Sequence, residues 1–177
     1  MAHVICFASS KGGTGKTTGA LNVAVALAEM GRRTALVDLD PQGGVALSLA
    51  KGDDEWPGLS DHLLKELALA DVLLKTKVPT LTLLPRGHLE PRDVESYETA
   101  LRNPALVRRV VDQLTDDREY VILDTPSGTG AITRAALAAS DFVLTPLQAE
   151  PLALRSFTQV VRVIDHEIGR ASCRERV

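Results

Sequence analysis

The segment Ser10–Thr18 constrains the fold of this chain more than any other feature, because both of its neighbours are strongly patterned. It follows the apolar run His3–Ala8, which predicts a buried strand. It leads into Thr17–Met30, which carries apolar residues at helical spacing and is followed by Gly31, a suitable left-handed end for a helix. A glycine-rich turn that joins a strand to a helix is the setting of a phosphate-binding loop, and it favours an α/β fold.

The residue types in this loop suit a nucleoside triphosphate. Gly12, Gly13 and Gly15 allow the backbone to turn its N–H groups inward around an anion, and the helix that follows directs its first N–H groups at the same place. We expect Lys16 to reach the terminal phosphates of ATP and the Thr17 hydroxyl to hold Mg²⁺. The candidate nucleotide-binding residues are Gly12, Gly13, Thr14, Gly15, Lys16, Thr17 and Thr18.

The loop departs from the strict pattern G-x-x-x-x-G-K-[ST] at its first position. Ser10 stands in the place of the first glycine, and an additional lysine, Lys11, precedes Gly12. The alternative interpretation is a glycine-rich turn that binds nothing. Phosphate binding is the stronger hypothesis, because the strand, the glycines, the lysine, the threonine and the helix all agree with it.

Strands and helices alternate along the rest of the chain, which predicts right-handed βαβ units. The expected fold is therefore an α/β P-loop NTPase with a mostly parallel sheet and helices on both faces. The expected strands are Thr34–Leu39, Thr80–Leu84, Tyr120–Leu123 and Phe142–Leu144. The expected helices are Leu59–Leu67, Ala70–Leu74, Ala105–Leu114, Ile132–Ala139 and a last one from near Pro151, whereas Gly43–Gly58 contains a polar, loop-like stretch.

Three acidic residues stand where predicted strands end. Asp38 and Asp40 are two residues apart, so we expect both to project to one face at the carboxyl end of the sheet, where ligands bind. The alternative is a pair of solvated turn acids before Pro41. Asp124 ends an apolar strand, where a carboxylate is costly unless a cation or donors face it, so we expect it to hold the Mg²⁺ shell.

Three motifs carry a family resemblance. The sequence KGGTGKTT from Lys11 resembles the deviant Walker A motif of the ParA/MinD class of ATPases. Val37–Gly43 (VDLDPQG) resembles the second acidic motif of that family, and Val121–Pro126 (VILDTP) resembles its Walker B strand. A weaker likeness continues through residues 139–146 and 148–150. The resemblance covers Met1 to about His166, and the DPQG form is most similar to partitioning ParA proteins.

The resemblance implies roles for the residues in these motifs. It implies that Asp40 orients or activates the attacking water and that Asp38 supports the magnesium or nucleotide site. It also implies that Lys11 reaches across a nucleotide-sandwich dimer to the phosphates of the partner. The expected catalytic residues are thus Lys11, Lys16 and Asp40, and the expected metal-site residues are Thr17, Asp38 and Asp124.

The resemblance further implies a Mg²⁺-dependent ATPase of plasmid or chromosome segregation, located in the bacterial cytoplasm at the nucleoid. ATP favours a homodimer in such proteins, the dimer binds DNA non-specifically, and a ParB-like or other centromere-binding protein stimulates hydrolysis. The adenine-contacting segment and much of the DNA surface lie further toward the C-terminus in the family. The fragment alone need not retain activity.

Three alternatives stay open. A MinD-like positioning ATPase works at a membrane through a C-terminal amphipathic helix, a region that we do not find in this chain. A dethiobiotin-synthetase-type ligase shares the phosphate loop, but Lys11 and the DPQG block argue against it. A non-hydrolysing nucleotide-binding adaptor is disfavoured by the presence of both Asp40 and Asp124.

Composition excludes several other classes of protein. Of 177 residues, 45% are hydrophobic and 24% are charged, which argues against disorder, and no apolar run approaches the ~20 residues of a membrane span. The net charge of −3 gives no sign of nucleic-acid binding, and two cysteines form no disulfide framework, so Cys6 is expected in the core.

The C-terminal segment Glu167–Val177 breaks the apolar pattern of the preceding helix. Ile168–Val177 resembles the in-frame translation of a common sequencing adapter, and segments of such origin are excluded from fold reasoning. We therefore expect a P-loop ATPase domain over residues 1–166, incomplete at its C-terminus, and a non-native tail over residues 167–177.

Overall fold

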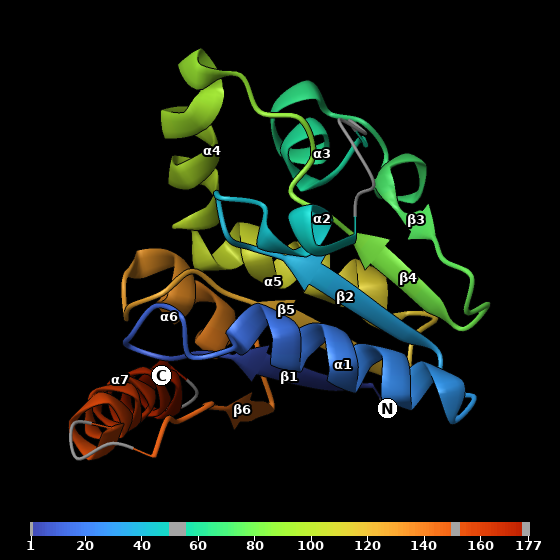
Figure 1. The fold of residues 1–177 in the computed structure, drawn as a ribbon. Helices are drawn as coiled ribbons and strands as arrows, with labels where there is room; N and C mark the ends of the chain where they lie inside the picture. Colours follow the sequence, from blue (N-terminus) through green and yellow to red (C-terminus); the bar gives the residue numbers. More distant parts are fainter. Residues whose placement is uncertain (1, 50–55, 150–152, 175–177) are drawn as a thin grey trace.

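A six-stranded sheet forms the centre of the computed structural model, which describes residues 2–49, 56–149 and 153–174 (Figure 1). The strands lie in the order β3-β4-β2-β5-β1-β6. They are β1 His3–Phe7, β2 Thr34–Asp38, β3 Leu74–Lys75, β4 Leu81–Leu84, β5 Tyr120–Asp124 and β6 Phe142–Leu144. All neighbours pair in parallel except β3, which pairs antiparallel with β4. The predicted α/β fold with a mostly parallel sheet is confirmed.

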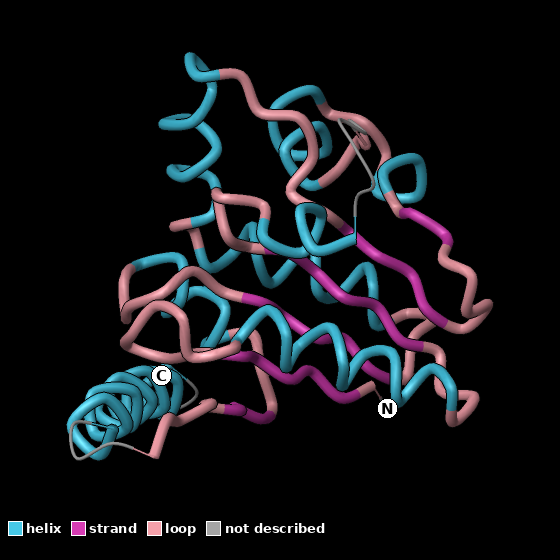
Figure 2. The backbone as a smooth tube through the Cα atoms, viewed as in Figure 1, coloured by secondary structure: helices cyan, strands magenta, loops and turns pink. Residues whose placement is uncertain are grey.

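Helices cover both faces of this sheet, as predicted. They are α1 Lys16–Glu29, α2 Gly44–Leu49, α3 Leu59–Lys65, α4 Val94–Leu101, α5 Pro104–Thr115, α6 Ala131–Ala138 and α7 Ala153–Arg174, with 3₁₀ turns at Leu69–Val72 and Pro91–Asp93. Figures 1 and 2 show α1 across one face and α5 and α6 behind the other. The crossovers between parallel strands place the helices there.

Side chains that alternate along each strand supply two separate cores. In β5, Ile122 packs on the α1 side with Ala20 and Ala24, whereas Val121 and Leu123 pack on the side of α4, α5 and α6. All five of these residues are fully buried. The small alanine side chains allow α1 to lie close to the strands. This packing explains why strands with apolar residues on both faces are buried throughout.

Several elements differ from the sequence prediction. The helix α2 is not predicted; it ends before the polar, loop-like stretch expected at residues 51–58. It is held because Val45 is buried in the core and its N–H group donates to the Asp38 carboxylate. The helix α4 is not predicted, and it is held by its buried Tyr97 and Leu101. The predicted helix Ala70–Leu74 is instead a 3₁₀ turn followed by β3, because pairing with β4 extends the chain there.

The last helix, α7, packs against α6. Val160 is buried as its apolar spacing predicts, but Leu154 and Phe157 of the same stripe stay 71% and 43% exposed. The backbone of α7 runs through Arg174, beyond His166. The assignment of residues 167–177 as a non-native tail stays a prediction, and residues 175–177 lie outside the described part. No helix in the described ranges is long and apolar enough to cross a membrane.

Candidate nucleotide-binding site

The carboxyl ends of three neighbouring strands meet at one edge of the sheet. Phe7, the last residue of β1, is in register with Asp124, the last residue of β5. Asp124 is also in register with Asp38, the last residue of β2. The loops that follow these strands are therefore adjacent in space, although their sequences are far apart (Figure 1).

The loop after β1 is held in a tight curve by its own polar groups. The Ser9 hydroxyl donates to the carbonyl oxygen of Lys11 at 2.7 Å and lies 2.8 Å from the Thr14 hydroxyl. Gly13 and Gly15 have φ angles of +70° and +87°, in the left-handed region that glycine adopts without strain. The loop thus enters α1 at Lys16 as an anion-binding turn requires.

An open pocket of about 350 Å³ lies at this loop. Its lining consists of Gly12, Gly13, Gly15, Lys16, Thr17, Thr18, Asp40 and Ser127. Lys16 is the first residue of α1 and is only 7% exposed, so its charge is held at the helix N-terminus inside the pocket wall. The first turn of a helix and a lysine together favour an anionic ligand.

Two predicted residues of the loop, Lys11 and Thr14, lie outside the residues that line the pocket in the described part of the chain. The Thr14 side chain is engaged with Ser9. Lys11 is half-buried, on the same loop. The pocket therefore brings together six of the predicted residues of the loop, and the role of Lys11 toward a partner stays a prediction.

Asp124 lies below the pocket with a carboxylate that is completely buried. Among the described residues neither of its oxygens has a hydrogen-bond partner. Burial raises the pKa of the Asp124 carboxyl to about 6, and the Thr17 hydroxyl and the Lys16 ammonium group lower that pKa in part. A carboxylate that burial destabilises in its ionised form needs more compensation than these groups give, so this position fits a cation or its water shell.

Asp38 and Asp40 have different surroundings, although we expected both to project to one face. Asp40 lines the pocket. Asp38 is completely buried, and its two oxygens accept the N–H groups of Asp40 and Val45, each at 3.0 Å. Burial raises the pKa of the Asp38 carboxyl to about 7. Asp38 thus fixes the segment that carries Asp40, and its support of the magnesium or nucleotide site stays a prediction.

These residues fit a magnesium–nucleotide complex better than a free metal ion. No group of three His, Cys, Asp or Glu side chains that could hold a metal occurs among residues 2–49, 56–149 and 153–174. Mg²⁺ in proteins often takes one or two protein ligands together with water and substrate phosphates. Thr17 and Asp124 could supply the protein side of such a shell.

Sequence reasoning missed two residues around this site. Ser127 lines the pocket from the loop after β5, and its signal was available, because the run Thr125–Gly130 follows a strand that ends at the same edge. Arg86 donates to the Pro41 carbonyl oxygen at 2.9 Å, from a loop 45 residues away. No local pattern announces that contact.

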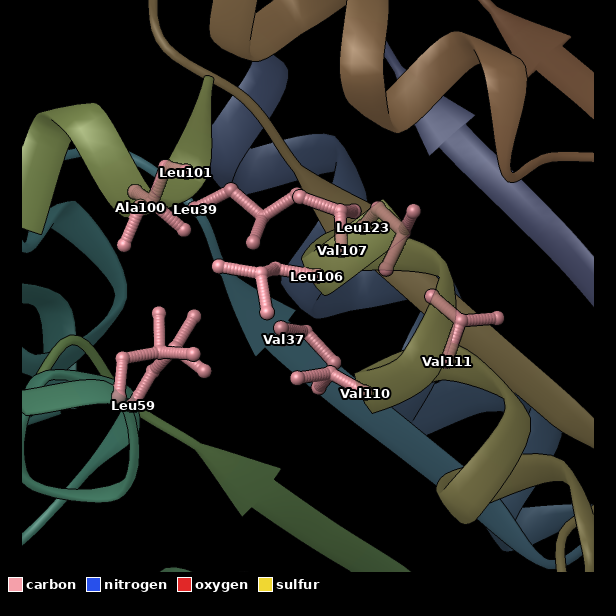
Figure 3. A pocket seen from close by; sticks show the side chains of 11 residues that line it. Val37, Leu39, Leu59, Ala100, Leu101, Leu106, Val107, Val110, Val111 and Leu123 are labelled. Atoms are coloured by element: carbon pink, nitrogen blue, oxygen red, sulfur yellow. The ribbon is translucent and has the colours of Figure 1, made fainter. Parts of the chain in front are cut away.

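A second cavity in the described region has a different character. It is a void of about 10 Å³ below β2 and β5, and Figure 3 shows apolar side chains from these strands and from α3, α4 and α5 around it. A cavity of this size and lining is no binding site for a nucleotide. It is a packing defect of the core.

Comparison with known proteins assigns nearly the whole chain to one family. A family model described as "AAA domain" matches residues 2–172. The chromosome partitioning protein ParA of Myxococcus xanthus is 37% identical over 167 residues, which are 93% of this chain and 59% of that protein. The chain spans about three fifths of the length of the curated relatives that it matches.

Two solved structures combine a similar fold with bound nucleotide. One is described as cobyrinic acid a,c-diamide synthase from Mycobacterium smegmatis with bound ADP and magnesium. It has a TM-score of 0.79 at 35% identity, and the match covers 94% of this chain and 68% of that one. The other is the septum site-determining protein MinD of Pyrococcus horikoshii with Mg-ADP, with a TM-score of 0.80 at 28% identity, 94% of this chain and 66% of that one.

Proposed function

The chain belongs to the ParA/MinD family of P-loop ATPases, and on that premise we propose that it binds and hydrolyses ATP with Mg²⁺ in a partitioning protein. The observation that carries the proposal is the polar pocket at the phosphate loop, with Asp40 in its wall and, below it, the buried Asp124 carboxylate, which accepts no hydrogen bond from the described residues. A negatively charged ligand with a divalent cation would satisfy both groups.

Each residue has a distinct role in this proposal. The backbone N–H groups of the glycine-rich loop bind phosphate oxygens, and Lys16 neutralises the terminal phosphates from the start of α1. Thr17 and Asp124 hold the magnesium shell, and bound Mg²⁺ supplies charge neutralisation at the phosphate oxygens. Asp40 orients the attacking water, and Asp38 fixes the segment that carries Asp40.

The finer mechanism is an ATP-dependent dimer switch. Lys11 contacts the phosphates of the partner subunit in an ATP-bound homodimer and stabilises charge in the transition state. That dimer binds DNA non-specifically in the cytoplasm at the nucleoid, and a ParB-like or other centromere-binding protein stimulates hydrolysis. Contacts with the γ-phosphate stabilise one state and are lost on hydrolysis, which gives the switch its direction.

Titration with labelled ATP and Mg²⁺, together with phosphate-release assays, tests the proposal. Lys16→Ala is expected to abolish ATP binding, because it removes the cation at the terminal phosphates. Asp40→Ala is expected to keep ATP binding and to lose turnover. Lys77→Ala is the matched control, because Lys77 is an exposed lysine outside the pocket lining.

Undiminished ATP binding in Lys16→Ala would overturn the phosphate-loop assignment. Normal phosphate release by Asp40→Ala would overturn the role of Asp40. Loss of binding in Lys77→Ala would show that the assay responds to charge alone.

A second candidate function is supported by one comparison. The neighbour at 35% identity is described as a diamide synthase. The alternative of an ATP-dependent ligase that acts on a carboxylate therefore stays open. In such an enzyme ADP release depends on the carboxylate substrate. Release of ADP without any small-molecule acceptor therefore supports the partitioning ATPase and argues against the ligase.

A further inference from the structure

Arg86, an arginine outside the phosphate loop, contacts the turn that carries Asp40. Arg86 follows β4 and is half-buried. Its Nη1 donates to the carbonyl oxygen of Pro41 at 2.9 Å, and its Nε donates to the carbonyl oxygen of Gly87 at 3.0 Å. The planar guanidinium group thus joins the segment after β4 to the segment after β2.

The backbone of Arg86 is itself fixed by the first turn of α3. The Ser60 N–H group donates to the Arg86 carbonyl oxygen at 2.8 Å, and the Leu59 N–H group donates to the Pro85 carbonyl oxygen at 2.8 Å. The Ser60 hydroxyl donates to the His88 carbonyl oxygen at 2.8 Å. Arg86 therefore reaches the Asp40 turn from a segment that is already held in place.

The turn that receives Arg86 is also held from its other side. The Asp40 carbonyl oxygen accepts the Gly43 N–H group at 2.9 Å, and the Asp40 Oδ1 accepts the Gln42 N–H group at 2.9 Å. Asp38 binds the N–H groups of Asp40 and Val45. Asp38 fixes the two ends of the turn, and Arg86 fixes its middle.

Gly43 makes the close approach of the guanidinium group possible. Its φ angle of +68° suits glycine, and a Cβ atom there would lie 3.2 Å from the Arg86 Cζ and Nε. The buried Tyr97 of α4 lies close to the same groups. Burial raises its pKa, Asp38 and Asp40 raise that pKa further, and Arg86 lowers it. We call the contact of Arg86 with the Pro41 carbonyl oxygen the clamp; it is partly buried, and a hydrogen bond shielded from water is stronger than one in bulk water.

We propose that Arg86 is a positioning residue that sets the place of Asp40 at the phosphate pocket. The inference rests on the proposed function, since it assigns a second support to the residue that orients water. Arg86 is not among the pocket-lining residues of the described chain, so it acts through the Pro41 carbonyl oxygen rather than on the nucleotide. A displacement of about 1 Å at Asp40 is enough to lower turnover strongly.

Three variants of the full chain test the clamp. Arg86→Ala removes both hydrogen bonds, and Arg86→Lys keeps a charge that can reach one carbonyl oxygen but loses the fork. Arg92→Ala is the matched control, because Arg92 is a 77% exposed arginine that pairs with Glu90 nearby. Circular dichroism shows whether each variant folds. If Arg86→Ala does not fold, Arg86→Lys is used for the measurements instead.

The first measurement is hydrogen exchange of the peptide that covers residues 40–45, with the α5 peptide 104–115 as internal reference. We expect exchange in residues 40–45 to become at least about fivefold faster in Arg86→Ala, because the turn opens more often. Arg86→Lys is expected to lie between that variant and wild type. The α5 peptide is expected to keep its rate, and Arg92→Ala is expected to match wild type in both peptides.

The second measurement is steady-state Mg-ATP hydrolysis. We expect Arg86→Ala to lower kcat by about tenfold or more with KM within about twofold, and Arg86→Lys to recover part of the loss. An unchanged exchange rate at residues 40–45, or a raised KM with an unchanged kcat, overturns the inference.

The two proposals fail in distinguishable ways. Absence of ATP turnover in the wild-type chain, combined with fast exchange in Arg86→Ala, contradicts hydrolysis by this chain and supports the clamp. Normal wild-type turnover combined with an unaffected Arg86→Ala contradicts the clamp alone.

Discussion

Tyr97 shows how far the energetics of a single side chain can be read from its surroundings. Its ring is completely buried on α4, and its hydroxyl has no hydrogen-bond partner among the described residues. A buried polar group without a partner costs about 1–3 kcal/mol. We therefore expect Tyr97→Phe to raise the free energy of unfolding by about 1 kcal/mol, measured by urea denaturation.

Tyr120→Phe is the matched control for this prediction. Tyr120 is half-buried at the start of β5, so removal of its hydroxyl is expected to change the free energy of unfolding by less than about 0.5 kcal/mol. A loss of more than about 1 kcal/mol in Tyr97→Phe would show that the Tyr97 hydroxyl is bonded after all.

Residue types in the candidate site were predictable wherever their role is local. The glycines, Lys16 and Thr17 of the loop follow from spacing, because a phosphate loop is one continuous segment. Arg86 was not predicted, because its contact with Pro41 depends on a segment 45 residues away. Ser127 was missed although it follows the same strand as Asp124, which was predicted. Asp38 was predicted beside the nucleotide, but its oxygens bind the backbone of the neighbouring turn.

The start of α3 depends on a close backbone contact at Gly58. A Cβ atom on Gly58 would lie 2.3 Å from the Pro85 carbonyl oxygen and 2.4 Å from the Gly87 nitrogen. Backbone atoms cannot rotate away, so α3 and the segment after β4 must separate. We expect Gly58→Ala to lower the free energy of unfolding by about 2–4 kcal/mol, measured by urea denaturation.

Gly130→Ala is the matched control, because no atom lies within 4 Å of a Cβ atom built there and its φ angle is −69°. Gly130 is the N-cap residue of α6, so a small loss of capping is expected there, and we expect the change to stay within about 1 kcal/mol. Equal stability of Gly58→Ala and wild type would contradict the close approach of the two backbones. Since the same contact carries Arg86, Gly58→Ala is also expected to loosen the Asp40 turn.

Elements were predictable from sequence when their own pattern defines them. The apolar runs of β1, β2 and β5 and the alanine-rich face of α1 predict strands and a helix directly. The helices α2 and α4 were missed because burial of Val45, Tyr97 and Leu101 against other elements holds them in the fold. Such helices are stabilised by tertiary packing, which cannot be seen in the local sequence pattern.

At the scale of the whole molecule, two buried carboxyl groups at one edge of the sheet make stability depend on pH. Burial raises the pKa of the Asp38 carboxyl to about 7 and that of the Asp124 carboxyl to about 6, from an ordinary value of 3.8. Between the ordinary pKa of 3.8 and these raised pKa values, the folded chain binds more protons than the unfolded chain. Their contribution to stability is therefore complete below about pH 4 and is lost as pH rises through 6 to 7.

The carboxyl group of Glu119 affects stability in the opposite direction, but it does so at a lower pH than Asp38 and Asp124. The Arg33 backbone N–H group and the Arg32 guanidinium group lower the pKa of the exposed Glu119 from its ordinary value of 4.5. Its contribution is present above that value and is lost as pH falls further. Unfolding between pH 5 and 8 thus reports mainly Asp38 and Asp124.

For the chain without nucleotide or Mg²⁺, we expect the free energy of unfolding to fall by on the order of 4 kcal/mol between pH 5 and pH 8. Urea denaturation in the presence of a chelator measures the slope, and Asp124→Asn is expected to reduce it, because that variant removes one of the two titrating groups. Mg-ADP is expected to flatten the slope as well, since a cation near Asp124 favours its ionised form and lowers its pKa. A free energy of unfolding that rises between pH 5 and pH 8 would contradict the assignment of a buried carboxyl group below the phosphate pocket. A slope that Asp124→Asn leaves unchanged would contradict it as well.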